Sequence, residues 1–139
     1  MINFYYENDF VLTNELKISN WINKVITSES YILNEINYIF CNDDYLHNIN
    51  VEFLNHDTLT DIITFDNTVG KSISSDIFIS TERVRQNAID FNVPFNEEIL
   101  RVIIHGILHL CGYNDKSEEE EKTMRLKENE KINMFHVEQ

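Results

Sequence analysis

One apolar stretch, from Ile99 to Leu110, constrains the fold more than any other part of this chain. Placed on a helix, its apolar residues leave almost no polar face: Ile99, Val102, Ile103, Ile107 and Leu108. A helix that is apolar nearly all round must be covered by other elements. We therefore expect a central, buried helix that is capped by Asn96 and ends before Gly112.

Two histidines share one face of this helix. His105 and His109 lie four residues apart, and ~3.6 residues make a turn, so both imidazoles can reach one metal ion. Gly112 is suited to end the helix in a left-handed conformation. The turn after Gly112 can bring Asp115 back toward the histidines, which predicts three protein ligands and an open coordination position.

Simpler interpretations of these residues stay open at this point. Buried histidines can instead donate to carbonyl groups, and Asp115 can be an ordinary loop residue. Cys111 is a possible soft ligand, but at two residues from His109 it points away along a helix, as a packed thiol would. The apolar setting, Gly106 and the turn that follows the helix favour the metal site.

The residue types indicate hydrolysis as the reaction class. A cation held by two imidazoles and one carboxylate lowers the pKa of bound water toward ~7 and polarises an ester or phosphodiester oxygen. Helical zinc peptidases carry a glutamate directly after the first histidine, where this chain has Gly106. A peptidase is therefore disfavoured, and Gly106 either leaves open space over the metal or allows close packing of the helix.

The remaining pattern predicts one domain, 1–139, of class α+β (α/β-like), with a single layer of sheet covered by helices. Alternating or β-branched segments predict strands at 2–7, 36–40, 60–65 and 75–79, and a hairpin joins the last two. Further helices are expected at 14–28, at 43–55, from the cap Ser80 to before Pro94, and from a Ser117–Glu120 capping box to about residue 133.

Charge and composition limit the partners and the compartment. A net charge of −13 argues against broad binding to a phosphate backbone, so a nucleic-acid substrate must be contacted locally. Neither a secretory signal nor a stretch long enough for a membrane span is visible. Cys41 and Cys111 are then expected as reduced thiols of a cytoplasmic protein.

The histidine helix also carries a family resemblance. The segment from His105 to Asp115, HGILHLCGYND, resembles the signature HGxLHLxGYDH of the YbeY family, rRNA maturation factors described as metal-dependent endoribonucleases. Upstream, NVEF at 50–53 followed by Asp57, TDIITF at 60–65 and SDIFI at 75–79 resemble further blocks of that family. The resemblance implies a mixed sheet of about four strands, a zinc ion, and a role in 16S rRNA 3′-end processing and ribosome quality control.

Carried over by position, His105, His109 and Asp115 would be the metal ligands, and Asp115 replaces the usual third histidine. A carboxylate is a harder ligand, which opens the site to divalent metals other than zinc. Asn114 replaces the usual aspartate, and Leu54 occupies the place of an arginine thought to lie near the RNA phosphates, so that a bidentate phosphate contact is lost.

These observations lead to two functional hypotheses. The first is a single-strand endoribonuclease that acts on rRNA and the ribosomal small subunit, without DNA or a membrane as partner. The candidates for substrate contact are Arg83, Arg85 and Arg101, which lie near the metal-site helix in sequence. The alternative is a ribosome-associated assembly or binding factor, with a structural metal and little nuclease activity.

Overall fold

The computed structural model describes residues 1–56 and 60–137. Asp57, which belongs to one of the resembling blocks, lies outside the described residues. The strands are β1 (Ile2–Tyr6), β2 (Ile32–Cys41), β3 (Ile62–Asp66) and β4 (Ser72–Ser80). The helices are α1 (Glu15–Ser28), α2 (Asp43–Leu54), α3 (Thr81–Phe91), α4 (Phe95–Leu110) and α5 (Glu118–Val137).

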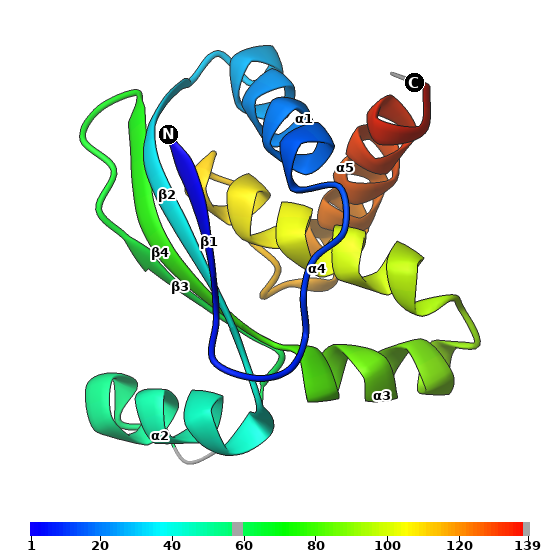
Figure 1. Ribbon diagram of the computed structural model, residues 1–139. Helices are drawn as coiled ribbons and strands as arrows, with labels where there is room; N and C mark the ends of the chain where they lie inside the picture. Colours follow the sequence, from blue (N-terminus) through cyan, green and yellow to red (C-terminus); the bar gives the residue numbers. More distant parts are fainter. Residues whose placement is uncertain (57–59, 138–139) are drawn as a thin grey trace.

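The strands form one mixed sheet in the order β1-β2-β4-β3. β2 pairs in parallel with both β1 and β4, while β3 pairs antiparallel with β4 as the expected hairpin. β3 therefore lies at an edge of the sheet. In Figure 1 the helices α1, α4 and α5 lie on one side of the sheet, and α2 lies at its lower end. The α+β architecture predicted from the sequence is confirmed.

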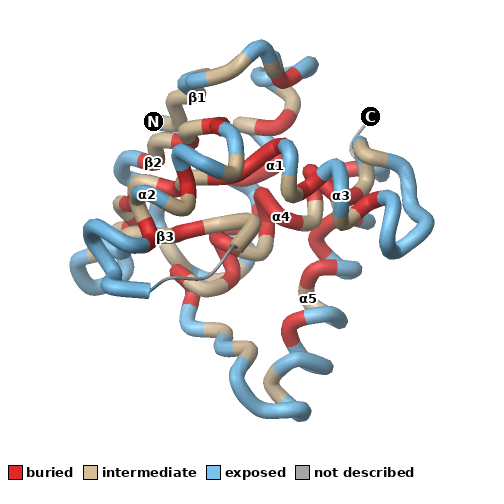
Figure 2. Tube along the Cα trace, turned by 90° about the horizontal axis from the view of Figure 1, so that it is seen from below, coloured by how far each residue is buried: buried red, intermediate tan, exposed pale blue. Residues whose placement is uncertain are grey.

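Helix α4 lies at the centre of the molecule, as its apolar composition predicts. Its buried residues pack on the inner face of the sheet, where Ile36, Tyr38 and Phe40 of β2 are fully buried. The Tyr38 hydroxyl donates to the Ile103 carbonyl oxygen at 3.1 Å, which satisfies the one polar atom that the ring brings into this core. Figure 2 shows that buried residues run along α4, whereas α2 is largely exposed.

Several expected helix ends are confirmed. The Ser80 hydroxyl accepts from the Arg83 N–H at 3.1 Å, and Ser117 and Glu120 form the reciprocal bonds of a capping box. The expected cap at Asn96 is wrong, because α4 begins at Phe95 and its N-cap is Pro94, two residues earlier. The Pro94 carbonyl oxygen accepts from the Glu97 and Glu98 N–H groups, at 3.1 Å and 3.2 Å, and so begins the hydrogen-bond ladder of the helix.

Three elements extend further than the sequence pattern predicts, and one of them is β4, which was expected at 75–79 and runs from Ser72 to Ser80. β2 begins at Ile32, four residues before the alternating segment, because β4 provides parallel partners along its length. α5 continues to Val137, where Phe135 packs edge to face on Trp21 of α1. Both cysteines are buried and free, and none of the described helices is long and apolar enough to cross a membrane.

Candidate metal centre

Three predicted ligand atoms converge on one point. The Nε2 atoms of His105 and His109 lie 2.9 Å apart, and Asp115 Oδ2 lies 3.2 Å from the first and 3.3 Å from the second. Tetrahedral coordination with bonds of about 2.0–2.1 Å separates ligand atoms by roughly 3.3 Å. The three side chains could therefore hold one metal ion, with a fourth position left for another ligand.

The turn after α4 explains how Asp115 reaches the histidines. The N–H groups of Gly112 and Tyr113 donate to the carbonyl oxygens of His109 and Leu108, each at 3.0 Å. This pair of bonds is a Schellman motif, which requires a left-handed residue at its centre. Gly112 supplies that residue with φ of 100°, and the chain then reverses toward the histidine face, as predicted.

The outer ring nitrogens determine where the imidazole protons lie. His105 Nδ1 is 2.7 Å from Glu128 Oε2, and His109 Nδ1 is 2.8 Å from the Tyr113 carbonyl oxygen. Ionised carboxylates and carbonyl groups only accept, so each Nδ1 donates. In the neutral rings both Nε2 atoms then direct lone pairs at each other and at Asp115. Three such acceptor atoms fit a positive charge at their centre, which either a metal ion or a proton can supply.

Electrostatics around His105 agree with this assignment. Burial opposes a charged ring, but the hydrogen bond and charge of Glu128, together with Asp115, raise the pKa of His105 above its ordinary value. Burial likewise opposes ionisation of Glu128, yet His105 and Arg101 hold the pKa of its carboxyl below the usual range. Without a metal, the site therefore attracts a proton, as expected of a site that stabilises positive charge.

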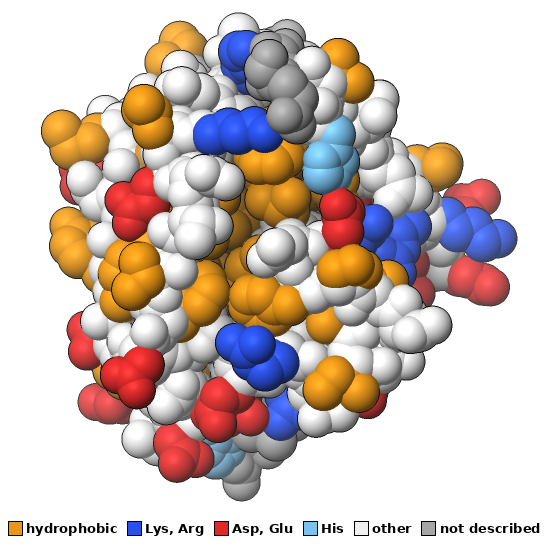
Figure 3. Space-filling view, turned by 45° about the vertical axis from the view of Figure 1, so that its right-hand side comes forward, with side chains coloured by type: hydrophobic (Ala, Val, Ile, Leu, Met, Phe, Trp, Pro, Cys, Tyr) orange, Lys and Arg blue, Asp and Glu red, His pale blue; other side chains and the backbone are white. Residues whose placement is uncertain are grey.

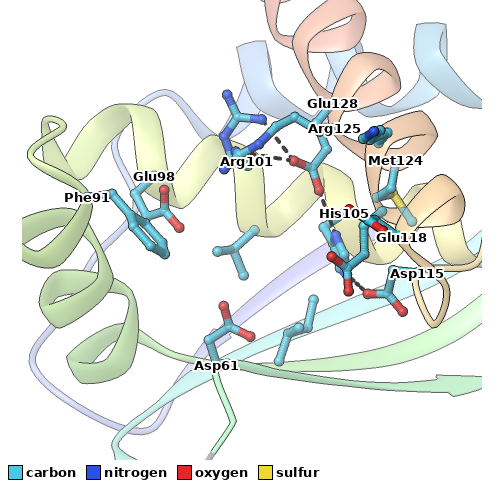
Figure 4. Close-up of a pocket in the computed structure, with 14 residues that line it drawn as sticks. Asp61, Phe91, Glu98, Arg101, His105, Asp115, Glu118, Met124, Arg125 and Glu128 are labelled. Atoms are coloured by element: carbon cyan, nitrogen blue, oxygen red, sulfur yellow. Dashed lines mark hydrogen bonds and ion pairs between the residues drawn. The ribbon is translucent and has the colours of Figure 1, made fainter.

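Two hollows meet at the metal cluster. One, of about 630 Å³, lies between α3, α4 and α5, and the other, of about 490 Å³, lies beside β3 and the end of α2. Asp61, Ile62, His105 and Asp115 line both. Figure 4 shows Asp61 on the wall opposite His105. Burial raises the pKa of the Asp61 carboxyl, although the charge of His105 opposes that shift.

The three predicted substrate-contacting arginines have different surroundings. Arg101 lines the larger hollow, where its guanidinium donates to Glu128 and Asn129. Arg83 pairs with Asp43 at 2.9 Å, and the guanidinium of Arg85 lies over the Phe95 ring. Neither Arg83 nor Arg85 lines the two hollows at the cluster, because sequence distance from α4 does not report on which side of α3 a residue points.

Sequence reasoning missed several residues at the site: Asp61, Lys122, Arg125 and Glu128. Three of them lie on α5, 17 to 23 residues after His105, and no local spacing links α5 to the histidine helix. Asp61 lies in a segment that was assigned only as a strand. The available signal was the capping box at Ser117, which places the start of α5 close to Asp115.

Two further sequence questions are answered by packing. Gly106 does not provide open space: a Cβ there would lie 3.0 Å from Ile62 Cδ1 and 3.3 Å from Thr64 Oγ1, so the glycine lets α4 pack closely against β3. Leu54 lines the smaller hollow, which also contains His105 and His109. An apolar side chain therefore lines this hollow at the position where the sequence resemblance implied an arginine.

The surface carries no continuous basic patch on the face drawn in Figure 3, where acidic, basic and apolar side chains are interspersed. This distribution agrees with the net charge of −13. Any anionic substrate must therefore be held by a few local cations.

Together these features define a class: a mixed α+β protein in which two histidines and one carboxylate converge where two hollows meet, next to an edge strand. Comparison with known proteins is more specific. The model of the Endoribonuclease YbeY family matches residues 3–136, and the chain belongs to that family.

Individual relatives agree over the full chain. It is 64% identical to a Flavobacterium johnsoniae protein named Endoribonuclease YbeY, over 100% of both chains. It is 59% identical to a Christiangramia forsetii protein of the same name, over 99% of this chain and 96% of that one. The solution structure of TM1509 from Thermotoga maritima superimposes with a TM-score of 0.70 at 26% identity, covering 99% of this chain and 91% of that chain.

Proposed function

We propose that this chain is a metal-dependent endoribonuclease that cleaves single-stranded rRNA in the cytoplasm, during 3′-end maturation of 16S rRNA on the small ribosomal subunit. The proposal rests on one observation above the others. Nε2 of His105, Nε2 of His109 and Oδ2 of Asp115 lie within 3.3 Å of one another, beside an open hollow. Membership of the Endoribonuclease YbeY family supports RNA as the substrate.

Zinc is the proposed resident metal. Two imidazoles and a carboxylate, with one position open, are a donor set of catalytic zinc sites, and the carboxylate also allows other divalent ions. When bound, the ion would supply Lewis acidity to a phosphodiester oxygen and lower the pKa of a bound water molecule. His105, His109 and Asp115 would hold it.

The other residues of the hollow have separate roles in this proposal. Asp61 faces His105 across the hollow and its raised pKa suits a group that accepts a proton during hydrolysis. Arg125 has a side chain that is 56% exposed, and with Lys122 it lines the same wall of α5. These two cations, with Arg101 behind them, would hold backbone phosphates of the RNA.

A second candidate has one observation in its favour. Leu54 lines the smaller hollow and offers no charge to a phosphate. The loss of a bidentate contact there weakens transition-state stabilisation, so a ribosome-associated assembly factor with a structural metal is the competing function.

RNA cleavage separates the two functions. Protein purified without a histidine tag should cleave a single-stranded RNA that contains the 16S rRNA 3′ end, lose activity with a chelator, and regain it with Zn²⁺. His109→Ala should lose at least about 100-fold in rate. His136→Ala is a matched control because His136 lies on α5 and pairs with Glu97. Equal cleavage by wild type and His109→Ala would favour the assembly factor.

A further inference from the structure

Glu128 of α5 is buried beside the metal cluster without belonging to it. Its side chain is 7% exposed, and every carboxylate oxygen has a partner. Oε2 lies 2.7 Å from His105 Nδ1, and Oε1 lies 2.8 Å from Arg101 Nη1. Figure 4 shows the carboxylate between these two side chains, with His105 leading on to Asp115.

The cost of burying this carboxylate indicates that its position is specific. An ion taken out of water must recover its hydration through charge-assisted bonds. Arg101 provides one such bond and reaches Asn129 with its other nitrogen at 2.9 Å. The guanidinium is therefore held at two points. It fixes Glu128 Oε1, so that Oε2 is directed at His105.

The two histidines differ in what supports them. The Nδ1–H of His109 donates to a neutral backbone carbonyl within its own turn, at 2.8 Å. The Nδ1–H of His105 donates to an anion from another helix, 23 residues further along the chain. A carboxylate partner fixes the tautomer and makes the opposite nitrogen a stronger donor to a metal.

We propose that Glu128 is a positioning residue that sets the tautomer, ring orientation and donor strength of His105 for the metal ion, and that Arg101 holds Glu128 in place. This inference rests on the proposed metal site of His105, His109 and Asp115. The proposed ligands lie on α4 and in the turn after it. In this inference α5 carries no ligand but still affects the metal affinity of the site. Arg101 then acts on the metal site through Glu128, in addition to any contact with RNA.

The test is metal affinity in the absence of RNA, measured for Zn²⁺ and Co²⁺ by competition with a chromophoric chelator. We expect Glu128→Ala to weaken binding roughly 10- to 100-fold, and Glu128→Gln to fall between that variant and wild type. Glu119→Gln removes an exposed carboxylate from the same helix and should bind as wild type does. Circular dichroism of the metal-free proteins checks that each variant is folded.

A spectroscopic signature separates positioning from general support of the fold. In the cobalt-loaded protein, the Nδ1–H protons of the two ligand histidines give separate, paramagnetically shifted resonances. Glu128→Gln keeps a side chain of the same size and should move the His105 resonance while leaving the His109 resonance in place. Movement of both resonances alike, or unchanged affinity in Glu128→Gln and Glu128→Ala, would overturn the proposal.

The outcomes also distinguish this proposal from the proposed function. If Glu128→Ala loses metal affinity and the wild-type protein cleaves no RNA, the positioning role is supported and the nuclease is contradicted. If Glu128→Ala binds metal as wild type does and the wild-type protein cleaves RNA, the positioning role is contradicted and the nuclease is supported.

Discussion

His105 and His109 face each other with their Nε2 atoms 2.9 Å apart, and the protons of both rings are donated outward. Two ring nitrogens at this distance need a positive charge between them, which a metal ion or a proton supplies. The relationship follows from a helical spacing of four residues combined with two acceptors, Glu128 and the Tyr113 carbonyl group, on the far side of the rings. It is the physical basis for the predictions about the metal site.

Asp115 is expected to set the metal preference. A carboxylate favours harder ions than an imidazole does, so Asp115→His should raise the preference for Zn²⁺ over Mn²⁺ roughly tenfold. Asp115→Ala should lose at least about tenfold in affinity for either ion. Competition titrations with both metals measure this, and an unchanged affinity in Asp115→Ala would remove Asp115 from the ligand set.

Gly112→Ala should weaken both the fold and the metal site. A Cβ at φ of 100° is strained, which costs about 1–2 kcal/mol in free energy of unfolding. Gly70→Ala is the control, because Gly70 also has a positive φ, of 60°, and lies in the turn between β3 and β4. Urea unfolding should show a lower free energy of unfolding for both variants, whereas metal affinity should fall only for Gly112→Ala. Equal metal affinity in the two variants would argue against control of Asp115 by this turn.

The Glu29 carboxylate should make the free energy of unfolding depend on pH. Burial opposes its ionisation, but Lys131 and the Tyr113 hydroxyl, at 2.8 Å and 2.7 Å, hold the pKa of the Glu29 carboxyl below its ordinary value of 4.5. A lowered pKa stabilises the fold above about pH 4.5, and this contribution is lost as the pH falls through the lower, folded-state pKa.

The Glu29→Gln variant tests that sign. In metal-free protein at pH 7, the free energy of unfolding of this variant should be about 2 kcal/mol lower than that of wild type. This difference should shrink below about pH 4.5. Glu35→Gln, at an exposed position of β2, is the control. A difference that stays constant from pH 7 down to about pH 3 would contradict the electrostatic explanation.

The effect of a Gly106 substitution on stability should depend on the size of its neighbour on β3. Alanine gains about 1 kcal/mol in helix propensity, but its Cβ would lie 3.0 Å from Ile62 Cδ1, so Gly106→Ala should change stability by less than about 1 kcal/mol. Ile62→Val removes that methyl group. In the Ile62→Val background Gly106→Ala should therefore stabilise by about 1 kcal/mol, and a double-mutant cycle without coupling would show that the contact is unimportant.

The sequence was most informative where the chemistry is local. The spacing of His105 and His109, the left-handed Gly112 and the return of Asp115 all depend on residues within one turn of each other, and the structure brings them together as predicted. The apolar surface of α4 likewise predicted its central position, since a helix of that composition must be covered.

The remaining features depend on long-range packing. Glu128 reaches His105 from another helix, and nothing in the spacing of either segment predicts that contact. Arg83 and Arg85 are near α4 in sequence, yet one pairs with Asp43 and the other lies over Phe95. Which face of α3 meets the site is decided by how it packs on α4, which short-range patterns do not report.

The most direct test of the metal centre is anomalous X-ray scattering from crystals of protein purified without a histidine tag and supplied with Zn²⁺. Data collected on both sides of the zinc absorption edge should give one strong peak within about 2.0–2.2 Å of His105 Nε2, His109 Nε2 and an Asp115 carboxylate oxygen. A difference map without a peak at these three atoms, from crystals that contain zinc elsewhere or none at all, would contradict the account.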